Sequence, residues 1–384
     1  SGQSGRITTY QRILGHLKNL FGIEFELYKQ GTILRRLERR MGMCAVSDLE
    51  VYLQLLSEDQ EESKALLDDL LIGVTSFFRD TRVFEHLRAE IIPELVRARL
   101  EQQEIRCWVP GCATGQEAYG LAMLLHEAAT AQNYQGQLRV FATDVHRQAL
   151  ETAGVGTYGE EELAAIPPEL LDRYVVRVTS KSGRAAPLLR KMVVFAAHNV
   201  LVDPAFTRLD MVSCRNLLIY FDTPAQELVL RTFRFCLNPE GILLLGVSEG
   251  IGSLHDDFAV VDARLRVFRK LRGAAAPYSP LESVQRQRIA VPPMAIAMRP
   301  FGVDRKDHRI GRDRFQPACG QHVVAFAHRP GEQGLEQRSR EDPVTHAVQF
   351  DLRGQCAEVL GDQRPLGIGA SRLLDQRARA GHQR

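Results

Sequence analysis

Apolar residues recur at helical spacing over the N-terminal part of the chain. Between Thr8 and Asp69 they fall three or four positions apart, the spacing that brings side chains to one face of a helix. Gly22 and Gly42 interrupt the pattern, and Ser47-Asp48 is a typical helix start. The apolar positions are Ile13, Leu17, Leu20, Ile33, Leu34, Leu37, Met41, Leu49, Tyr52, Leu53 and Leu56. We therefore predict a helical domain over residues 1–82.

From Glu104 onward the pattern changes to short apolar segments that alternate with longer amphipathic ones. This alternation predicts parallel β-α-β units and hence an α/β fold with an open, Rossmann-like sheet. The predicted strands are Ile105–Val109, Leu138–Ala142, Leu209–Ser213 and Ile242–Val247. The predicted helices are Glu117–Ala129, His146–Gly154 and Pro224–Leu237. Two further segments, Phe258–Val261 and Arg264–Phe268, predict a closing antiparallel hairpin.

The remaining segments complete the domain organisation. Two β-rich pieces, Tyr174–Thr179 and Met192–Ala196, predict a small antiparallel insertion over about residues 174–197 of a catalytic domain at 83–272. Residues 273–384 are expected to form a linker and an Arg- and Gln-rich tail. The tail shows little periodicity, which favours disorder or a poorly packed appendage over a regulatory or nucleic-acid-binding role. We assign it no function.

Composition and charge narrow the class of protein. With 45% hydrophobic and 25% charged residues, the chain has an ordinary globular composition, and a net charge of +2 gives no strong field for nucleic acid. It shows no apolar run of roughly 18 residues and no secretory signal. The seven cysteines form no Cys-x-x-Cys pair, which argues against a zinc site and indicates a cytoplasmic protein. Because the first residue is Ser1 and the first methionine is Met41, we expect a piece of a longer protein.

The strongest local pattern is Val109-Pro-Gly-Cys-Ala-Thr-Gly-Gln-Glu117, which follows a predicted strand and leads into a predicted helix. Gly111 and Gly115 carry no Cβ, so the main chain can turn tightly there and approach a ligand closely. At the carboxyl end of the first strand, such a turn forms the floor of a nucleotide pocket. The next strand ends in Asp144, and an acidic residue there can accept hydrogen bonds from both hydroxyls of a ribose.

The same turn favours one cofactor over another. It does not match Gly-x-Gly-x-x-Gly, because Ala113 takes the middle position, and the helix opens with Gln116-Glu117. A carboxylate at a helix start would repel a pyrophosphate, but it suits a cofactor that has no phosphate and carries an ammonium and a sulfonium. These residues therefore favour S-adenosylmethionine over NAD.

Two other segments carry candidate chemistry. The first, Leu71–Asp80, contains Arg79 after two phenylalanines. The alternative to a functional role for this segment is a helix end with a solvated arginine. The second, Leu209–Asp222, begins as a buried strand and continues at the position where a doubly wound sheet presents residues to its ligand. Its alternative interpretation is a core strand with a structural tyrosine. The polar residues after this strand are Arg215, Asn216 and Tyr220.

Several of these motifs together resemble one family. Residues 21–272 are similar to the chemotaxis receptor methyltransferases, the CheR family, and most similar to the methyltransferase module of hybrid CheB/CheR/PAS sensory proteins. The stretches that carry the resemblance are LYKQGTILRRLERRM, VTSFFRD, VPGCATGQEAYG, FATDV, HNVLVDPAFTRLDMVSCRNLLIYFD and LNPEGILLLGVSE. Such unrelated motifs in one order and spacing make the resemblance highly specific.

The resemblance implies roles for individual residues. It places the Thr-x-Phe-Phe-Arg stretch at the cofactor and the active site, Glu117 near the methionine amino group, Asp144 on the ribose, and an Asn-Leu pair near the adenine. Gly73 departs from the family pattern, because relatives carry Asn or Ser there, and a side-chain contact to the cofactor is lost. The implied catalytic residues are Arg79 and Tyr220. The implied cofactor-binding residues are Gly73, Thr75, Arg79, Gly111, Gly115, Glu117, Asp144, Asn199, Val200, Arg215 and Asn216.

A protein substrate needs a further surface. Arg35, Arg36, Arg39 and Arg40 form i,i+4 pairs on one predicted helix, and Glu38 interrupts the patch. A solvated face is the ordinary interpretation; the resemblance implies that this helix docks the acidic methylation helices of chemoreceptors. In some relatives the β insertion also grips a receptor's C-terminal peptide, whereas the short loop here resembles members that do not need it.

Together these inferences predict a protein-glutamate O-methyltransferase that acts on chemoreceptors or another signalling protein. A glutamate is already ionised at pH 7, with a reference pKa of about 4.3, so the enzyme needs no general base. The alternative is a catalytically weak S-adenosylmethionine-binding sensory or regulatory module. Methyl transfer to nucleic acid or a small molecule is less favoured, because no Asn/Asp-Pro-Pro-Tyr motif is present.

Overall fold

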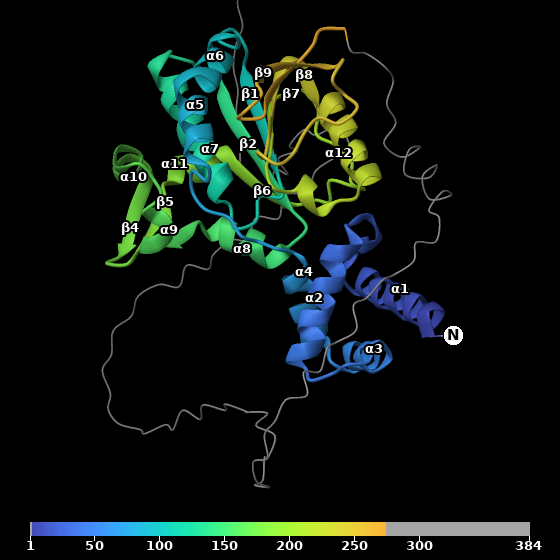
Figure 1. Cartoon of the computed structure of the whole chain (residues 1–384). Helices are drawn as coiled ribbons and strands as arrows, with labels where there is room; N and C mark the ends of the chain where they lie inside the picture. Colours follow the sequence, from blue (N-terminus) through green and yellow to red (C-terminus); the bar gives the residue numbers. More distant parts are fainter. Residues whose placement is uncertain (1, 274–384) are drawn as a thin grey trace, which may run out of the picture. The chain divides into compact units, whose positions relative to one another are not determined.

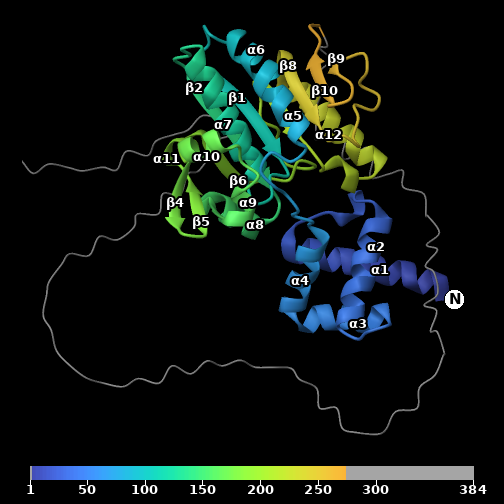
Figure 2. The ribbon, with the colours of Figure 1, turned by 60° about the vertical axis from the view of Figure 1, so that its left-hand side comes forward.

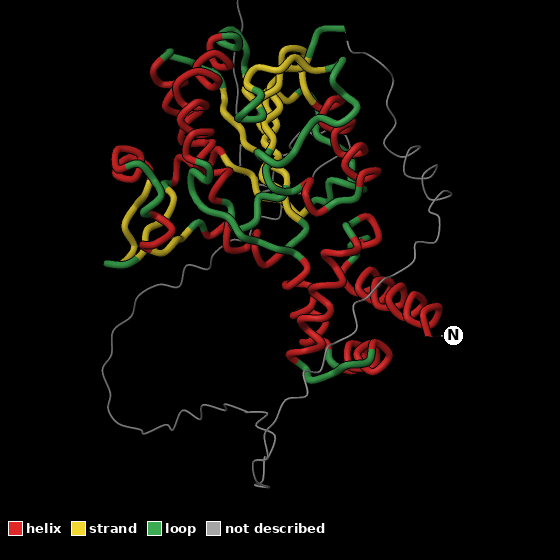
Figure 3. Tube along the Cα trace, in the orientation of Figure 1, coloured by secondary structure: helices red, strands yellow, loops and turns green. Residues whose placement is uncertain are grey.

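The computed structural model describes residues 2–273, with side chains described from Thr8 onward. The predicted linker beyond residue 273 and the Arg- and Gln-rich tail lie outside the described residues. Figure 1 shows an N-terminal group of helices and a larger α/β domain that carries a small second sheet. Figure 3 separates the helices from the strands along the same trace.

Four helices and a short 3-10 turn form the helical domain, which confirms its predicted class. Its helices pack around a core of their own that includes Ile13, Leu37 and Tyr52. Asp48 and Asp59 are the N-cap residues of helices α3 and α4, and their carboxylates accept hydrogen bonds from main-chain N–H groups of the first turn. The elements are α1 (Gly2–Phe21), η1 (Phe25–Leu27), α2 (Gln30–Met43), α3 (Leu49–Glu58) and α4 (Gln60–Leu70).

A mostly buried ion pair joins the helices of this domain. The Arg40 guanidinium on α2 pairs with the Glu62 carboxylate on α4, and the Tyr52 hydroxyl on α3 donates to the same carboxylate at 2.7 Å. Burial raises the pKa of Glu62, but the hydrogen bonds from Arg40 and Tyr52 outweigh it, so the net pKa is lowered. Glu62 therefore stays ionised and holds three helices together.

The α/β domain is built on a seven-stranded sheet in the order β6-β2-β1-β7-β8-β10-β9. Strands β6, β2, β1, β7 and β8 run parallel, and β10 and β9 close the sheet as an antiparallel hairpin. The predicted α/β class and the hairpin are thereby confirmed. The strands are β1 (Glu104–Pro110), β2 (Gln137–Asp144), β6 (Val193–Ala197), β7 (Leu209–Cys214), β8 (Leu237–Leu245), β9 (Phe258–Asp262) and β10 (Val267–Lys270).

Helices cover both faces of this sheet, which divides the core into two layers (Figures 1 and 2). Successive strand residues point to opposite faces, so Cys107 belongs to the layer under α7 and Trp108 to the layer under α12. The Trp108 indole N–H donates to the Thr143 hydroxyl at 2.9 Å, which satisfies its polar group within the core. The helices are α5 (Thr81–His86), η2 (Leu87–Ile91), α6 (Ile92–Arg97), α7 (Gln116–Ala131), α8 (Arg147–Val155), η3 (Leu218–Tyr220) and α12 (Thr223–Cys236).

The small antiparallel sheet, here called the β-subdomain, corrects one prediction. Tyr174–Thr179 corresponds to one of its strands, but Met192–Ala196 corresponds to β6, which pairs parallel with β2 in the main sheet. After helix α11 (Pro187–Met192) the chain returns to the main sheet. The β-rich composition of Met192–Ala196 predicts a strand but does not show which sheet that strand joins. The β-subdomain has the order β3-β5-β4. Its elements are β3 (Thr157–Gly159), α9 (Glu160–Leu163), α10 (Pro168–Tyr174), β4 (Val175–Thr179) and β5 (Ser182–Ala185).

Within the described residues, no helix combines the length and the apolar character needed to cross a bilayer. The cysteines of this part of the chain are all free thiols, and four of the five are buried.

The buried ion pair gives a first testable prediction. Replacing Glu62 by alanine leaves Arg40 and the Tyr52 hydroxyl without their partner, so we expect the free energy of unfolding to fall by about 2–3 kcal/mol. Because the Glu62 pKa is lowered in the folded state, this contribution is present above the ordinary glutamate pKa and is lost as the pH falls through the folded value. Denaturant unfolding at neutral and acidic pH measures both effects.

The matched control is Glu61→Ala on the same helix. Glu61 pairs with Lys64 on the surface, where its side chain is 81% exposed, so we expect a change below about 0.5 kcal/mol. Equal losses for the two variants would contradict the structural role of Glu62.

Candidate active site

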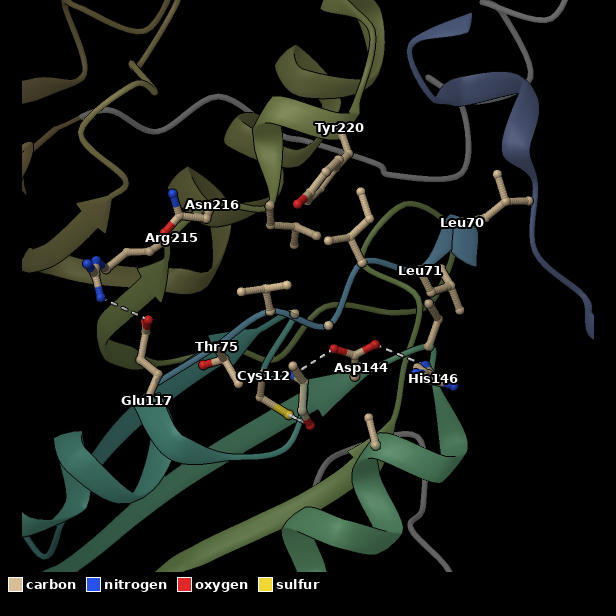
Figure 4. A pocket seen from close by; sticks show the side chains of 18 of the residues that line it. Leu70, Leu71, Thr75, Cys112, Glu117, Asp144, His146, Arg215, Asn216 and Tyr220 are labelled. Carbon is tan, nitrogen blue, oxygen red and sulfur yellow. Dashed lines mark hydrogen bonds and ion pairs between the residues drawn. The ribbon is translucent and has the colours of Figure 1, made fainter. Parts of the chain in front are cut away.

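A pocket of about 840 Å³, partly open to solvent, lies at the carboxyl ends of β1, β2 and β7. Parallel strands present their following loops at this edge, and such loops form ligand sites in open α/β sheets. Figure 4 shows Asp144 and Tyr220 on opposite sides of the pocket, with Glu117 and Arg215 together at another side. The lining residues are Tyr28, Leu70, Leu71, Ile72, Gly73, Val74, Thr75, Arg79, Gly111, Cys112, Ala113, Glu117, Asp144, Val145, His146, Ala149, Arg215, Asn216, Leu217 and Tyr220.

The Gly-rich turn after β1 forms the floor of the pocket. Gly111 and Gly115 have φ of +67° and +92°, a backbone region that favours glycine, and Ala113 adopts φ +47° between them. Gly111 lines the pocket, whereas Gly115 is not among the lining residues. A Cβ on Gly115 would lie 2.9 Å from the Ala153 Cβ. Gly115 thus permits close packing at the start of α7, and a contact between Gly115 and the cofactor stays a prediction.

Asp144 ends β2 and faces the pocket. Its two carboxylate oxygens accept the main-chain N–H groups of Ala113 at 2.8 Å and His146 at 2.9 Å. These bonds fix the carboxylate against the Gly-rich turn, and each oxygen retains a lone pair for a further donor. The geometry suits the expected contact with a ribose.

Glu117 opens α7 and is held by two residues of β7 and its following loop. The Ser213 hydroxyl donates to Glu117 Oε1 at 2.6 Å, and Arg215 Nη1 donates to Oε2 at 3.0 Å. The Arg215 side chain is fully buried, so its positive charge compensates the Glu117 carboxylate inside the protein. This pair joins the first and third loops of the pocket.

Arg215 also holds the segment between the two domains. Its Nη2 donates to the Asp80 carboxylate at 2.6 Å and to the Arg79 carbonyl at 2.9 Å. Asp80 has φ +60° and Phe78 has φ +49°, so the main chain turns sharply there. This turn places Thr75 and Arg79 among the residues that line the pocket, ten residues or fewer after α4 ends at Leu70.

The loop after β7 is held by a buried carboxylate that sequence reasoning did not single out. Glu249 accepts the main-chain N–H groups of Gly246 at 2.6 Å, Asn216 at 3.1 Å and Ile219 at 3.3 Å. Asn216 adopts φ +60°, a conformation that asparagine tolerates better than most residues. Glu249 is the last residue of LNPEGILLLGVSE, one of the stretches that carry the family resemblance.

Tyr220 projects into the pocket from this loop. Burial raises its pKa, and the nearby Arg79 and Arg36 guanidinium groups oppose this rise without cancelling it. The hydroxyl therefore stays protonated at neutral pH and can donate a hydrogen bond. Arg79 is half-buried and donates from Nη1 to the Val74 carbonyl at 3.1 Å, which leaves further guanidinium donors for a ligand.

Besides Gly115, two predicted cofactor residues are not among those that line the pocket. Asn199 bonds locally, since its main-chain N–H donates to the Asp203 carboxylate at 2.7 Å and its side-chain oxygen accepts from Leu201 at 3.1 Å. Val200 is buried against the core layer under α12. The structure thus places this pair in the turn after β6, and an adenine contact from it stays a prediction.

Among the lining residues that the sequence did not predict, three have polar side chains. Tyr28 comes from the helical domain, Cys112 from the floor of the pocket, and His146 from the turn before α8. Burial raises the pKa of the Cys112 thiol well above its ordinary value, so it remains neutral. His146 Nε2 lies 2.9 Å from Asp68 Oδ1 on α4, a contact between the two domains. Tyr28 stands inside the stretch LYKQGTILRRLERRM, but its residue type gave no indication of a pocket role.

The predicted docking arginines do not form one uniform surface. Arg35 and Arg39 are exposed on α2, and Arg39 Nη1 lies 3.6 Å from Asp69 Oδ1. Arg36 is half-buried and lies near enough to Tyr220 to oppose the rise of its pKa. Arg40 is different, because its side chain is only 14% exposed and pairs with Glu62. We therefore remove Arg40 from the candidate docking surface, which leaves Arg35, Arg36 and Arg39.

The donor set of the pocket fits S-adenosylmethionine. The Asp144 carboxylate can accept from two ribose hydroxyls, and the Glu117 carboxylate can attract the ammonium group of the cofactor. Arg215 Nε is buried and has no hydrogen-bond partner among the described residues. The carboxylate of the cofactor is an acceptor of the kind that this N–H group lacks. Leu71, Ile72, Val145, Ala149 and Leu217 supply apolar lining.

Fold and site together define a methyltransferase that depends on S-adenosylmethionine. The CheR methyltransferase SAM-binding domain matches residues 73–267, and the CheR methyltransferase all-alpha domain matches residues 8–71. The chain belongs to the CheR methyltransferase family, and its pocket binds S-adenosylmethionine.

Three relatives show the range of this similarity. A chemotaxis protein methyltransferase of Escherichia coli is 33% identical over 65% of this chain and 87% of that protein. An uncharacterized 104.1 kDa protein of Rhodobacter capsulatus is 43% identical over 69% of this chain, which spans only 28% of that protein. A probable biofilm formation methyltransferase, WspC, of Pseudomonas putida is 31% identical over 62% of this chain and 56% of that protein.

The position of Asp144 predicts a specific loss of cofactor binding. Asp144→Ala removes the ribose acceptor and frees two main-chain donors, so we expect the Kd for S-adenosylhomocysteine to rise at least about tenfold. Calorimetry on the full chain measures this value. Asp172→Ala, which removes an exposed carboxylate on α10, is the control and should bind as the parent chain does. An unchanged Kd for Asp144→Ala would refute the assignment.

Gly73 allows the opposite experiment. A Cβ built at Gly73 meets no atom within 4 Å, so Gly73→Asn introduces a polar side chain at the pocket without a steric clash. We expect the Kd for S-adenosylhomocysteine to fall about threefold to tenfold, the effect of one net hydrogen bond. Gly154→Asn on α8 also meets open space and serves as the control. Weaker binding by Gly73→Asn alone would contradict the expected contact.

Proposed function

We propose that this chain transfers a methyl group from S-adenosylmethionine to glutamate side chains of chemoreceptors or of receptor-like signalling proteins. The observation that carries the proposal is the convergence of Arg79 and Tyr220 on the cofactor pocket from two separate segments. One offers a guanidinium with free donors and the other a protonated hydroxyl, and both groups suit a carboxylate acceptor.

The names of the relatives support the same substrate class. Chemotaxis protein methyltransferases from four further bacteria and strains are 29–32% identical and are covered over 85–91% of their length. The chain spans only 28% of the large Rhodobacter capsulatus relative, which supports a methyltransferase module within a longer protein. For such a longer protein too, glutamate side chains of chemoreceptors or receptor-like proteins are proposed as the substrate.

The acceptor carboxylate needs position more than activation. Its reference pKa of about 4.3 makes it ionised at neutral pH, so no side chain has to remove a proton. The cofactor supplies an electrophilic methyl; the carboxylate oxygen forms a bond to this carbon while the carbon–sulfur bond breaks, and its electron pair remains on sulfur. The protein must remove water from the carboxylate and align one oxygen with the departing sulfur.

Arg79 and Tyr220 are placed for this alignment. Arg79 can hold one acceptor oxygen by a charge-assisted hydrogen bond, and the Tyr220 hydroxyl can orient the carboxylate. Too strong a contact would stabilise the anion and slow its attack, so a single arginine and a neutral hydroxyl suit the step better than several cations. Among the lining residues the one imidazole, that of His146, contacts Asp68.

Two exposed arginines and one half-buried arginine of α2 give the substrate a docking surface. Arg35, Arg36 and Arg39 present positive charge on the helix whose first turn adjoins Tyr220. Acidic helices of a receptor would be attracted to this charge, an effect that weakens as salt rises.

A transfer assay tests the proposal directly. Full-length protein and S-adenosylmethionine with a radioactive methyl are incubated with cytoplasmic fragments of chemoreceptors, and base-labile methyl ester is measured. Ester formation on glutamate supports the proposal. Binding of the cofactor without transfer to any receptor fragment would instead favour a regulatory S-adenosylmethionine-binding module.

Arg79→Ala is expected to lower turnover by at least about 100-fold, because the acceptor loses the group that aligns it. Its Kd for S-adenosylhomocysteine should change much less. Arg82→Ala removes an exposed arginine three residues away, outside the pocket lining, and should keep full activity. Full activity of Arg79→Ala in the same assay would refute the proposed role.

A further inference from the structure

The helical domain inserts three residues, Leu27–Lys29, against the loop that carries Tyr220. We call these three residues the strap. The Lys29 main-chain N–H donates to the Tyr220 carbonyl at 2.8 Å, and the Asp222 N–H donates to the Leu27 carbonyl at 3.1 Å. Between these two bonds Tyr28 and Phe221 form an isolated antiparallel bridge. The strap thus pairs like a short strand with the loop that carries Tyr220.

Aromatic packing fixes the middle residue of the strap. The Tyr28 ring meets the Phe221 ring edge-on at 5.0 Å and the Phe25 ring at 5.1 Å. Phe221 and Phe25 are each only 1% exposed, so this contact belongs to the cores of both domains. Such ring pairs stabilise the structure beyond simple burial, and they restrict the direction of the Tyr28 side chain.

That direction takes the Tyr28 side chain to the pocket. Tyr28 lines the same cavity as Asp144. Burial and the Asp144 carboxylate both raise the Tyr28 pKa, so the hydroxyl is neutral. Within residues 2–273 we find no hydrogen bond to this hydroxyl. The Tyr28 side chain is half-buried, and the pocket is the place where a ligand could supply a hydrogen-bond partner for its hydroxyl.

We propose that Tyr28 is a further cofactor-binding residue, which contacts the nucleoside part of the ligand beside Asp144 and is held there by the strap. The pocket is therefore completed by both domains. Lys29 acts as a positioning residue through its main-chain N–H, because its side chain takes no part in the pairing. The inference concerns cofactor binding and rests on the proposed function only in the choice of S-adenosylmethionine as the methyl donor.

The backbone of the strap permits a precise test. Lys29 has φ −57°, within the range of proline, and Tyr28 has φ −95° and ψ 154°, which a residue before proline readily adopts. Lys29→Pro therefore removes the bond to the Tyr220 carbonyl without forcing a new backbone conformation. Lys29→Ala is the matched control, because it removes the same side chain and keeps the N–H.

Calorimetry with S-adenosylhomocysteine on the full chain measures the effect, and thermal unfolding of each variant reports stability separately. We expect Tyr28→Phe to raise the Kd about threefold to tenfold, the loss of one hydrogen bond. Lys29→Pro should raise the Kd by a similar factor, while Lys29→Ala binds within twofold of the parent chain. Tyr134→Phe, which removes a buried hydroxyl outside the pocket lining, should leave the Kd unchanged.

The outcomes are distinct. Unchanged binding by Tyr28→Phe would overturn the contact between its hydroxyl and the ligand. If Lys29→Pro lowers the Tm but binds the ligand like Lys29→Ala, the strap is merely structural and its positioning role is refuted. Because this assay contains no acceptor protein, it can fail or succeed independently of the glutamate transfer proposed above.

Discussion

The guanidinium of Arg215 lies fully inside the protein and joins three segments that are far apart in the sequence. It pairs with Glu117 at the start of α7 and with Asp80 in the turn between the domains, while its own position follows β7. The Phe84 ring lies beneath it, 5.3 Å from the guanidinium carbon. Removing such a charge from water costs several kcal/mol, so the guanidinium is stable there only while both carboxylates accompany it. The relative positions of the pocket loops therefore depend on this one group.

Two other carboxylates around the pocket, half-buried Asp144 and buried Glu249, also hold main-chain N–H groups in place. Asp144 binds two N–H groups of neighbouring turns, and Glu249 binds three from the loop of Tyr220. The turns that they hold contain positive-φ residues such as Ala113 and Asn216, which cost energy that the surrounding structure must offset. A strained but well-bonded backbone brings the loops close to a ligand and holds them in place before it binds.

Local patterns in the sequence were sufficient to predict the parallel sheet, the Gly-rich turn and the position of Asp144 at the end of a strand. Each of these features depends on residues that are close in the chain. Other features depend on partners that periodicity cannot show. Arg40 fits a basic stripe on α2, yet Glu62, twenty-two residues later, removes its charge from the surface. Met192–Ala196 has the composition of a strand, but its pairing with β2 is decided by where α11 returns the chain. Arg215 was expected at the cofactor, and only the folded structure shows how many of its donors are already bound to protein.

The distribution of charge in the pocket bears on the acceptor. Of the two carboxylates expected at the cofactor, Glu117 is compensated by Arg215, and Asp144 is stabilised by main-chain N–H groups. Arg79 is thus the cation of the pocket whose donors are not bound to a protein carboxylate, and Arg36 adds positive potential near Tyr220. A neutral or cationic acceptor would gain little from this arrangement. A carboxylate gains a hydrogen-bond partner that offsets part of the free-energy cost of removing it from water. The internal pairing of the other charges therefore supports the carboxylate acceptor that we propose.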